Sequence, residues 1–253
     1  MISVLTYHQI DHVEPADDPL GISVTPESFS EQMTYLHNND FTCLSLSEAV
    51  TYWETKKTPP TKAFILTFDD GYRDLYTTVY PILEPLGFTA TIFLVADQVG
   101  GHSNWVGQGS QPLLNWNEIH ELRSAGFTFD SHTLSHRRLT TLDEAEVTRE
   151  VKQSKEIIEQ NLGEEVNFIS YPYNDHNPRI QDIVASSGYR AACAGERQPW
   201  NLYNIWRMRC EKKDTLRRFS WKARGSQYHI IRLRQHPLIH STGRQVKKFL
   251  LRK

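Results

Sequence analysis

The sequence predicts an α/β protein, a single, distorted and incomplete β/α barrel of about seven parallel strands. Short apolar, β-rich runs and stretches with helical periodicity alternate at least six times along the chain. Such alternation is typical of a parallel sheet with helical crossovers. The length of 253 residues is enough for one such barrel, and 39% hydrophobic and 23% charged residues are ordinary for a globular domain.

The first half of the chain alternates apolar runs with helical patterns. Thr25 and Pro26 mark the start of the first helix, because a threonine N-cap followed by proline is a typical helix start. Pro81 and Pro85 should shorten or kink the second helix. In chain order we expect a strand at 2–8, a helix at 24–39, a strand at 63–70, a helix at 75–86 and a strand at 89–95.

A long loop at residues 98–112, with four glycines and no periodicity, separates the two halves. In the second half, Thr141 and Glu144 have the spacing of a capping box, and Gly163 is placed to end the same helix. We expect a helix at 115–126, a strand at 127–132, a helix at 140–163, a strand at 166–173, a helix at 179–188 and a strand at 189–194.

Several polar residues follow the expected strands directly. His8, Asp69, Asp70, His132 and Tyr173 all fall at or just past a strand end. Because the chemistry of a parallel barrel lies at the carboxyl ends of its strands, we expect these residues to share one site.

The adjacent carboxylates Asp69 and Asp70 repel each other, and a metal ion offsets that repulsion best. His132 and His136 are four residues apart, so on a helical turn both imidazoles would lie on one face. Two histidines and one carboxylate, with a position left for water, are typical of zinc or another hydrolytic divalent metal. The alternative interpretation is surface histidines near a buried, hydrogen-bonded aspartate.

The stretches TFDDGY (67–72) and SHTLSH (131–136) resemble the first two motifs of the polysaccharide deacetylase family, which is carbohydrate esterase family 4 with the NodB-homology domain. FISYPYN (168–174) resembles the third motif. With the opening LTYHQI (5–10), the chain is similar to the branch that includes bacterial poly-N-acetylglucosamine deacetylases. The resemblance covers roughly residues 2–210.

The resemblance implies that Asp70, His132 and His136 hold a divalent metal, zinc first, with nickel or cobalt as alternatives. It also implies that Asp69 is the general base, which takes a proton from metal-bound water. Chemistry agrees, because a metal-bound carboxylate stays ionised while its neighbour remains free to accept a proton.

Further roles follow from the same branch of the family. His8 would be the general acid for the leaving amine, since this branch carries its catalytic histidine near the N-terminus; a hydrogen-bonded core histidine is the alternative. The backbone N–H of Tyr173 would stabilise the oxyanion. The third motif commonly holds an arginine that orients the catalytic aspartate. Arg207, in NIWRMRC (204–210) at the end of another expected strand, would stand in for it. Asn174 replaces the usual glycine and tolerates a left-handed backbone.

Three residues are candidates for substrate binding: Trp105 in the glycine-containing loop, Pro172 of the third motif and Arg207. An aromatic face at Trp105 would pack on the apolar face of a sugar ring. For Trp116, at the start of a helix, we expect core packing instead.

The predicted function is metal-dependent removal of N-acetyl groups from a saccharide that contains N-acetylhexosamine, in exopolysaccharide biosynthesis. An O-acetyl polysaccharide esterase and a catalytically inactive carbohydrate-binding barrel are the alternatives. The sequence does not separate amide from ester substrates.

Charge is distributed unevenly along the chain. Residues 205–253 contain 15 Lys or Arg against Glu211 and Asp214, a net of +13, and subtraction from the totals leaves −15 for the preceding residues. We expect a catalytic barrel at 1–210 and a basic extension at 211–253 packed on or beside it. Such an extension suits an anionic membrane surface and a lipid-linked precursor, or it balances the acidic body. Nucleic acid is not favoured, because no recognition motif is present.

The N-terminal stretch MISVLTYHQI has no basic leader or long apolar centre, so we expect no signal peptide and a cytoplasmic protein, peripheral at the inner membrane. No apolar stretch approaches the ~18 residues that span a bilayer. Cys43, Cys193 and Cys210 form no C-x-x-C pair and are expected to be reduced.

Overall fold

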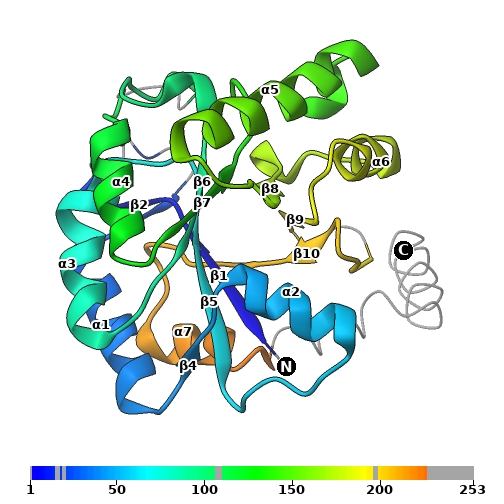
Figure 1. The fold of residues 1–253 in the computed structure, drawn as a ribbon. Coiled ribbons are helices and arrows are strands. Elements are labelled where there is room, and N and C mark those ends of the chain that lie inside the picture. The colour runs from blue at the N-terminus through cyan, green and yellow to red at the C-terminus, as the bar shows by residue number, and fades with distance from the viewer. Residues whose placement is uncertain (1, 15–17, 19–20, 106–109, 196–198, 227–253) are drawn as a thin grey trace, which may run out of the picture.

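A computed structural model describes residues 2–14, 18, 21–105, 110–195 and 199–226. Parallel strands form a nearly closed barrel, and helices surround it (Figure 1). This confirms the predicted fold class. The strands are β1 Ser3–Tyr7, β2 Gln9–Ile10, β3 Ser23–Val24, β4 Thr42–Cys43, β5 Ala63–Phe68, β6 Thr91–Leu94, β7 Thr128–Ser131, β8 Phe168–Ser170, β9 Ala191–Ala194, β10 Ile205–Trp206 and β11 Met208–Arg209.

A single piece of chain brings the two edges of the barrel sheet together. The strand order is β10-β9-β8-β7-β6-β5-β1-β11, with β4 paired to the start of β5, and every pair is parallel. The first and last strands of this order, β10 and β11, are separated in the chain only by Arg207. Residues 205–209 therefore pair with β9 at one end and with β1 at the other, and Arg207 lies where the sheet closes.

The helices on the outside begin and end close to the expected positions. Thr25 caps α1, as predicted, and the expected kinked helix is a π-helix, a short α-helix and a 3-10 turn in succession. The helices are α1 Pro26–Asn38, α2 Leu46–Thr55, η1 Leu75–Val79, α3 Tyr80–Leu83, η2 Glu84–Leu86, η3 Ala96–Gln98, α4 Trp116–Ser124, η4 Leu139–Thr141, α5 Glu144–Leu162, η5 Pro172–Asn174, α6 Pro178–Ser186 and α7 Leu216–Ala223.

The predicted cap of the longest helix, α5, was wrong by two residues. Asp143, not Thr141, is the N-cap, and its side chain forms a capping box with Glu146. Both pairs have the same spacing, and Thr141 is taken up in the preceding 3-10 turn η4. Gly163 ends α5 in a left-handed conformation, as expected.

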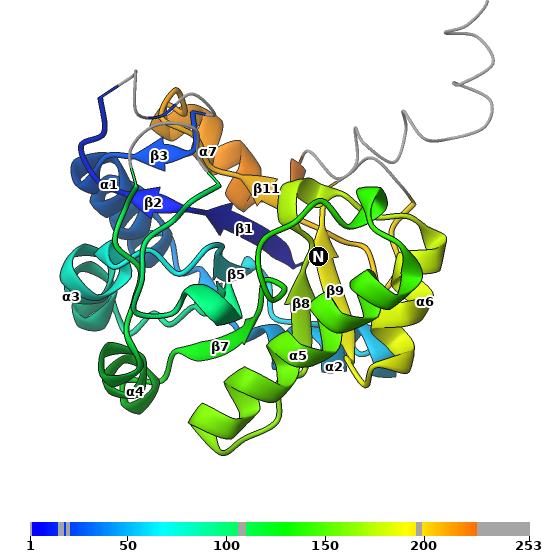
Figure 2. The ribbon, with the colours of Figure 1, turned by 90° about the horizontal axis from the view of Figure 1, so that it is seen from above.

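The side chains inside the barrel change from apolar to polar along the length of the strands. At the amino ends of the strands, interior side chains form an apolar cluster with α2, which covers that end (Figure 2). On β1, β5 and the segment that joins β10 to β11, the same alternation presents a polar side chain two residues further along: Val4 is followed by Thr6, Ile65 by Thr67 and Ile205 by Arg207. The cluster contains Val4, Leu46, Ala49, Val50, Ile65, Phe93, Phe168, Cys193 and Ile205, among others.

Residues outside the barrel sheet also have defined places. Trp116 packs against the outer core, as expected, and the three cysteines are free thiols.

In the extension expected at 211–253, α7 packs on α1 and β1, and Ser3 Oγ donates to Lys222 O at 2.8 Å. Residues 227–253 lie outside the described part. None of the helices in the described residues combines the length and the hydropathy that a membrane-spanning segment needs.

Candidate active site

The turn after β5 directs two neighbouring carboxylates to different partners. Asp69 N still donates to Tyr7 O at 3.1 Å, so Asp69 continues the strand. Asp70 and Gly71 both have a φ of 74°, in the left-handed region. Glycine adopts this conformation without strain, and a Cβ on Gly71 would also lie 2.9 Å from Leu94 Cδ2. Asp69 therefore contacts Arg207, whereas Asp70 contacts His132 and His136, although the two carboxylates are adjacent in sequence.

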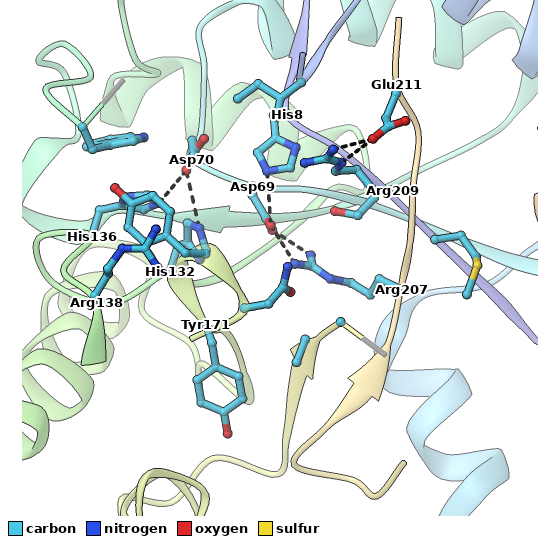
Figure 3. A pocket seen from close by; sticks show the side chains of 18 of the residues that line it. His8, Asp69, Asp70, His132, His136, Arg138, Tyr171, Arg207, Arg209 and Glu211 are labelled. Carbon is cyan, nitrogen blue, oxygen red and sulfur yellow. Dashed lines mark hydrogen bonds and ion pairs between the residues drawn. The ribbon is translucent and has the colours of Figure 1, made fainter. Parts of the chain in front are cut away.

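Asp70, His132 and His136 form a buried cluster that can hold a metal ion. Their possible ligand atoms all lie within 4.8 Å of one another. Asp70 Oδ1 is 3.4 Å from His132 Nε2 and 3.2 Å from His136 Nε2 (Figure 3). Asp70 Oδ1 has no hydrogen-bond partner among the described residues, and a cation would compensate for its burial.

The spacing of the two histidines suggested a helical turn, but this prediction was wrong. They belong to a loop after β7, in which Thr133 and His136 have positive φ values of 69° and 59°. Thr133 Oγ1 accepts a hydrogen bond from His136 N at 3.2 Å. The loop therefore brings the imidazoles together by a backbone reversal, and their ring centroids are 4.9 Å apart.

Buried groups behind the cluster fix this loop. His132 Nδ1 lies 2.7 Å from Ser170 O, which leaves Nε2 to face Asp70. On α5, the fully buried Glu150 accepts hydrogen bonds from Ser135 N and Ser135 Oγ. Neither contact was expected from the sequence. For Glu150 a signal exists, because it interrupts the apolar stripe on the buried face of α5.

Asp69 and Arg207 form a buried ion pair beside the cluster. The guanidinium donates from Nη1 to Asp69 Oδ1 at 2.7 Å and from Nη2 to Oδ2 at 2.6 Å (Figure 3). It also donates to Thr67 Oγ1 and Ser170 Oγ. Burial is the largest single effect on Asp69 and opposes its ionisation, but the charge and hydrogen bonds of Arg207, together with His132 and His8, outweigh burial and hold the pKa of this carboxyl well below its usual value. Asp69 is therefore ionised and fixed in orientation.

His8 follows β1 and lies on the side of Asp69 opposite to Arg207 (Figure 3). Its Nε2 is 3.8 Å from Asp69 Oδ2. Burial lowers the pKa of His8, and the charges of Asp69 and Asp70 offset that effect only in part. The same cause, burial, lowers the pKa of His132 to about 4, which keeps its imidazole neutral, the form that binds metal.

These side chains line one pocket of about 520 Å³ at the carboxyl ends of the strands. Tyr173 and Trp105 are part of its wall, and their rings contact His136 with centroid distances of 4.7 Å and 4.5 Å. Pro172 is buried and does not line the pocket. Arg138, which the sequence did not single out, lies over the Tyr173 ring at 4.1 Å.

The sequence profile described as Polysaccharide deacetylase matches residues 56–192, more than half of the chain. The chain belongs to the polysaccharide deacetylase family. The region that matches this deacetylase family contains Asp69, Asp70, His132 and His136. His8 and Arg207 lie outside it, so their place at the site is known from the fold.

Relatives within the polysaccharide deacetylase family are distant. The chain is 27% identical over 195 residues to a putative polysaccharide deacetylase, YxkH, of Bacillus subtilis, a match that covers 77% of this chain and 64% of that protein. It is 26% identical over 188 residues to a poly-β-1,6-N-acetyl-D-glucosamine N-deacetylase of Staphylococcus epidermidis, covering 67% and 63%. The chain thus spans less than two thirds of the length of these relatives.

Solved structures of deacetylases share the fold. The Streptococcus pyogenes deacetylase PplD, in complex with acetate, superposes with a TM-score of 0.76 at 23% identity, covering 88% of this chain and 97% of that one. BC0361, a polysaccharide deacetylase from Bacillus cereus, gives a TM-score of 0.72 at 25% identity, covering 88% and 68%.

Proposed function

We propose that this chain is a metal-dependent hydrolase that removes N-acetyl groups from N-acetylhexosamine units of a poly- or oligosaccharide. The buried cluster of Asp70, His132 and His136 next to the ionised Asp69 is the observation that carries the proposal. Family membership supports it, as do relatives named poly-β-1,6-N-acetyl-D-glucosamine N-deacetylase.

The donor set fits zinc, with nickel or cobalt as alternatives. Asp70, His132 and His136 would be the ligands, since two imidazoles and one carboxylate leave positions for water and substrate. A divalent ion bound there supplies Lewis-acid polarisation of the acyl carbonyl and lowers the pKa of a water molecule.

Asp69 and His8 would move the protons. Asp69 accepts the proton that the attacking water loses, as an ionised carboxylate held by Arg207. A lowered pKa favours neutral His8 at rest, so His8 takes up that proton from Asp69 Oδ2, 3.8 Å from its Nε2. His8 then donates it to the leaving nitrogen. Hydroxyl adds to the acyl carbon and hydrogen to the amine, which gives acetate and a free amine.

Tyr173 and Trp105 would position the acetamido group. Tyr173 follows β8 with a φ of 58°, and we assign its backbone N–H to the oxyanion. Trp105 lines the pocket beside His136, so its ring is placed to pack on the apolar face of the sugar. Arg207 is bound to Asp69 and acts on substrate through it. Pro172 supports the turn from behind the pocket wall.

We extend the proposal to a lipid-linked saccharide as one candidate substrate. Its support is the net charge of +13 in residues 205–253, which would favour an anionic membrane surface. Most of that segment, residues 227–253, is outside the described part of the chain. Co-sedimentation of the full chain with anionic but not neutral vesicles is the expected result. Equal binding to both, or none, would contradict this extension.

Acetate release tests the main proposal. Metal-loaded protein should release acetate from N-acetylchitotetraose, lose this activity with a chelator and regain it with zinc. Asp69→Asn is the matched variant, because it keeps the three metal ligands and loses the base; about 10²-fold or greater loss is expected with metal still bound. Release from O-acetylated saccharide alone would favour the esterase. Metal binding without any acetate release would favour a carbohydrate-binding barrel.

A further inference from the structure

The pocket wall carries more positive charge than the reaction on a neutral sugar requires. Five arginine or lysine side chains line it, against three carboxylates, a net of +2 before any metal is bound. A divalent ion would raise this further. A cleft with a net positive charge favours an anionic substrate.

Four of the five cations are already paired. Arg207 is paired with Asp69 and Arg209 with Glu211, while Arg218 and Lys222 share Asp214. The described residues provide no ion-pair partner for the fifth, Arg138, whose side chain is exposed at the pocket wall. Its charge is therefore available to a ligand.

Arg138 is also held in place. Its guanidinium lies 4.1 Å from the Tyr173 ring centroid, and that ring contacts the metal-ligand candidate His136 at 4.7 Å. Stacking on an aromatic face limits the motion of the planar guanidinium and leaves its N–H groups free to donate. Figure 3 shows Arg138 beside His136, on the side of the cluster away from Arg209.

We propose that Arg138 binds an anionic substituent, phosphate or carboxylate, carried by the saccharide whose N-acetyl group lies at the Asp70–His132–His136 cluster. This rests on the proposed deacetylase function and specifies its substrate class. The planar fork of Arg138 matches two oxygens of either group. The preferred substrate is thus an acidic saccharide, and Arg138 determines that specificity.

Arg137 provides a matched control. It precedes Arg138 in the chain, does not line the pocket, and is paired with Glu146 at 3.0 Å. Arg137→Gln and Arg138→Gln remove the same charge from neighbouring positions. Only the second should affect discrimination between acidic and neutral substrates.

The experiment measures kcat/KM of the metal-loaded full chain for three saccharides: neutral N-acetylchitotetraose, a hyaluronan tetrasaccharide with carboxylates, and a chito-oligosaccharide phosphate. Wild type and Arg137→Gln should prefer at least one acidic saccharide by about tenfold. Arg138→Gln should reduce that preference to within about twofold, chiefly through KM. A preference for the hyaluronan tetrasaccharide would identify carboxylate as the bound group, and a preference for the chito-oligosaccharide phosphate would identify phosphate.

Equal kcat/KM for acidic and neutral saccharides in wild type would overturn the inference and leave the deacetylase proposal standing. An equal loss on all saccharides in Arg138→Gln would also overturn it, because Arg138 would then act only by positioning Tyr173. Absence of acetate release from every saccharide by wild type would overturn the deacetylase proposal and this inference with it. Calorimetric binding of the same saccharides to Asp69→Asn should repeat the acidic preference without turnover.

Discussion

The two ends of the barrel interior are built by the same strands from different side chains. At the amino ends, Val4, Ile65 and Ile205 pack with α2 in an apolar cluster. At the carboxyl ends, Thr6 and Arg207 line the pocket, and Thr67 accepts a hydrogen bond from Arg207. The apolar end gains stability from burial, whereas the polar end buries charges that need partners. Stability and chemistry are therefore expected to depend on separate layers of the same strands.

The largest effect is expected at Arg207, which belongs to both the fold and the site. Arg207→Ala leaves Asp69 buried and unpaired, so unfolding free energy should fall by about 3–5 kcal/mol and acetate release should drop strongly. Urea unfolding and kinetics of the same protein check this. Arg207→Lys retains the charge without the bidentate geometry. Its unfolding free energy and its activity should lie between those of wild type and Arg207→Ala. Unchanged stability in Arg207→Ala would show that the pair does not secure the polar end.

A buried carboxyl group on β7, beside Phe93 and Phe168 of the apolar cluster, should make stability depend on pH. Asp130 is 4% exposed, burial raises its pKa to about 7, and hydrogen bonds from Asn167 N and Phe168 N offset this only in part. The native state keeps a proton that the unfolded state loses near pH 4, so stability should fall as pH rises from about 4 to 7. The full loss would be on the order of 4 kcal/mol.

Asp130→Asn mimics the protonated carboxyl and should remove most of that decline. Thermal or urea midpoints at pH 5 and pH 8 for wild type and Asp130→Asn measure it. A variant that declines with pH as steeply as wild type would mean that Asp130 is ionised in the native state.

A substitution in the apolar layer should separate stability from chemistry. Ile65→Ala removes buried methyl groups two residues before Thr67 and should cost about 2–5 kcal/mol. Metal content and kcat should stay within about twofold of wild type below the unfolding transition. A large loss of metal affinity in Ile65→Ala would show that the two layers are not independent.

A smaller effect is expected at Glu150, which holds the loop that carries the proposed ligands His132 and His136. Glu150→Gln cannot accept from both Ser135 N and Ser135 Oγ as the carboxylate does, so metal affinity should fall by about 10–100-fold. Glu150→Ala should lower the metal affinity further, because it removes both acceptors. Competition with a chromogenic chelator gives the affinities, and Glu146→Gln at the exposed capping box of α5 is the control. Equal effects in Glu150→Gln and the control would exclude this positioning role.

Sequence reasoning located the polar ends of the strands because strand periodicity and position along the chain are local properties. Asp70 and His132 could be assigned to one edge without knowing the loop between them. The conformation of that loop was not predicted, since left-handed residues at Thr133 and His136 depend on contacts with α5 and β8. α2 was not expected either, although the Ser45–Glu48 capping box is a local signal for it.

Arg207 shows where local reasoning ends. Its assignment as the partner of Asp69 came from family resemblance, and we expected a strand that simply ended there. The structure instead divides that strand, so that Arg207 lies at the closure of the sheet between pairing with β9 and with β1. Arg138 had no sequence signal, because its exposed position beside Tyr173 depends on the fold.

The most direct test of this account is the metal content of wild type, Asp70→Ala and Asp69→Asn, measured by elemental analysis after loading with zinc and desalting. We predict about one ion per chain in wild type and Asp69→Asn and none in Asp70→Ala, because Asp70 is a proposed ligand and Asp69 is paired with Arg207. Equal zinc in wild type and Asp70→Ala, or no zinc in wild type, would contradict the metal site at the polar end of the barrel.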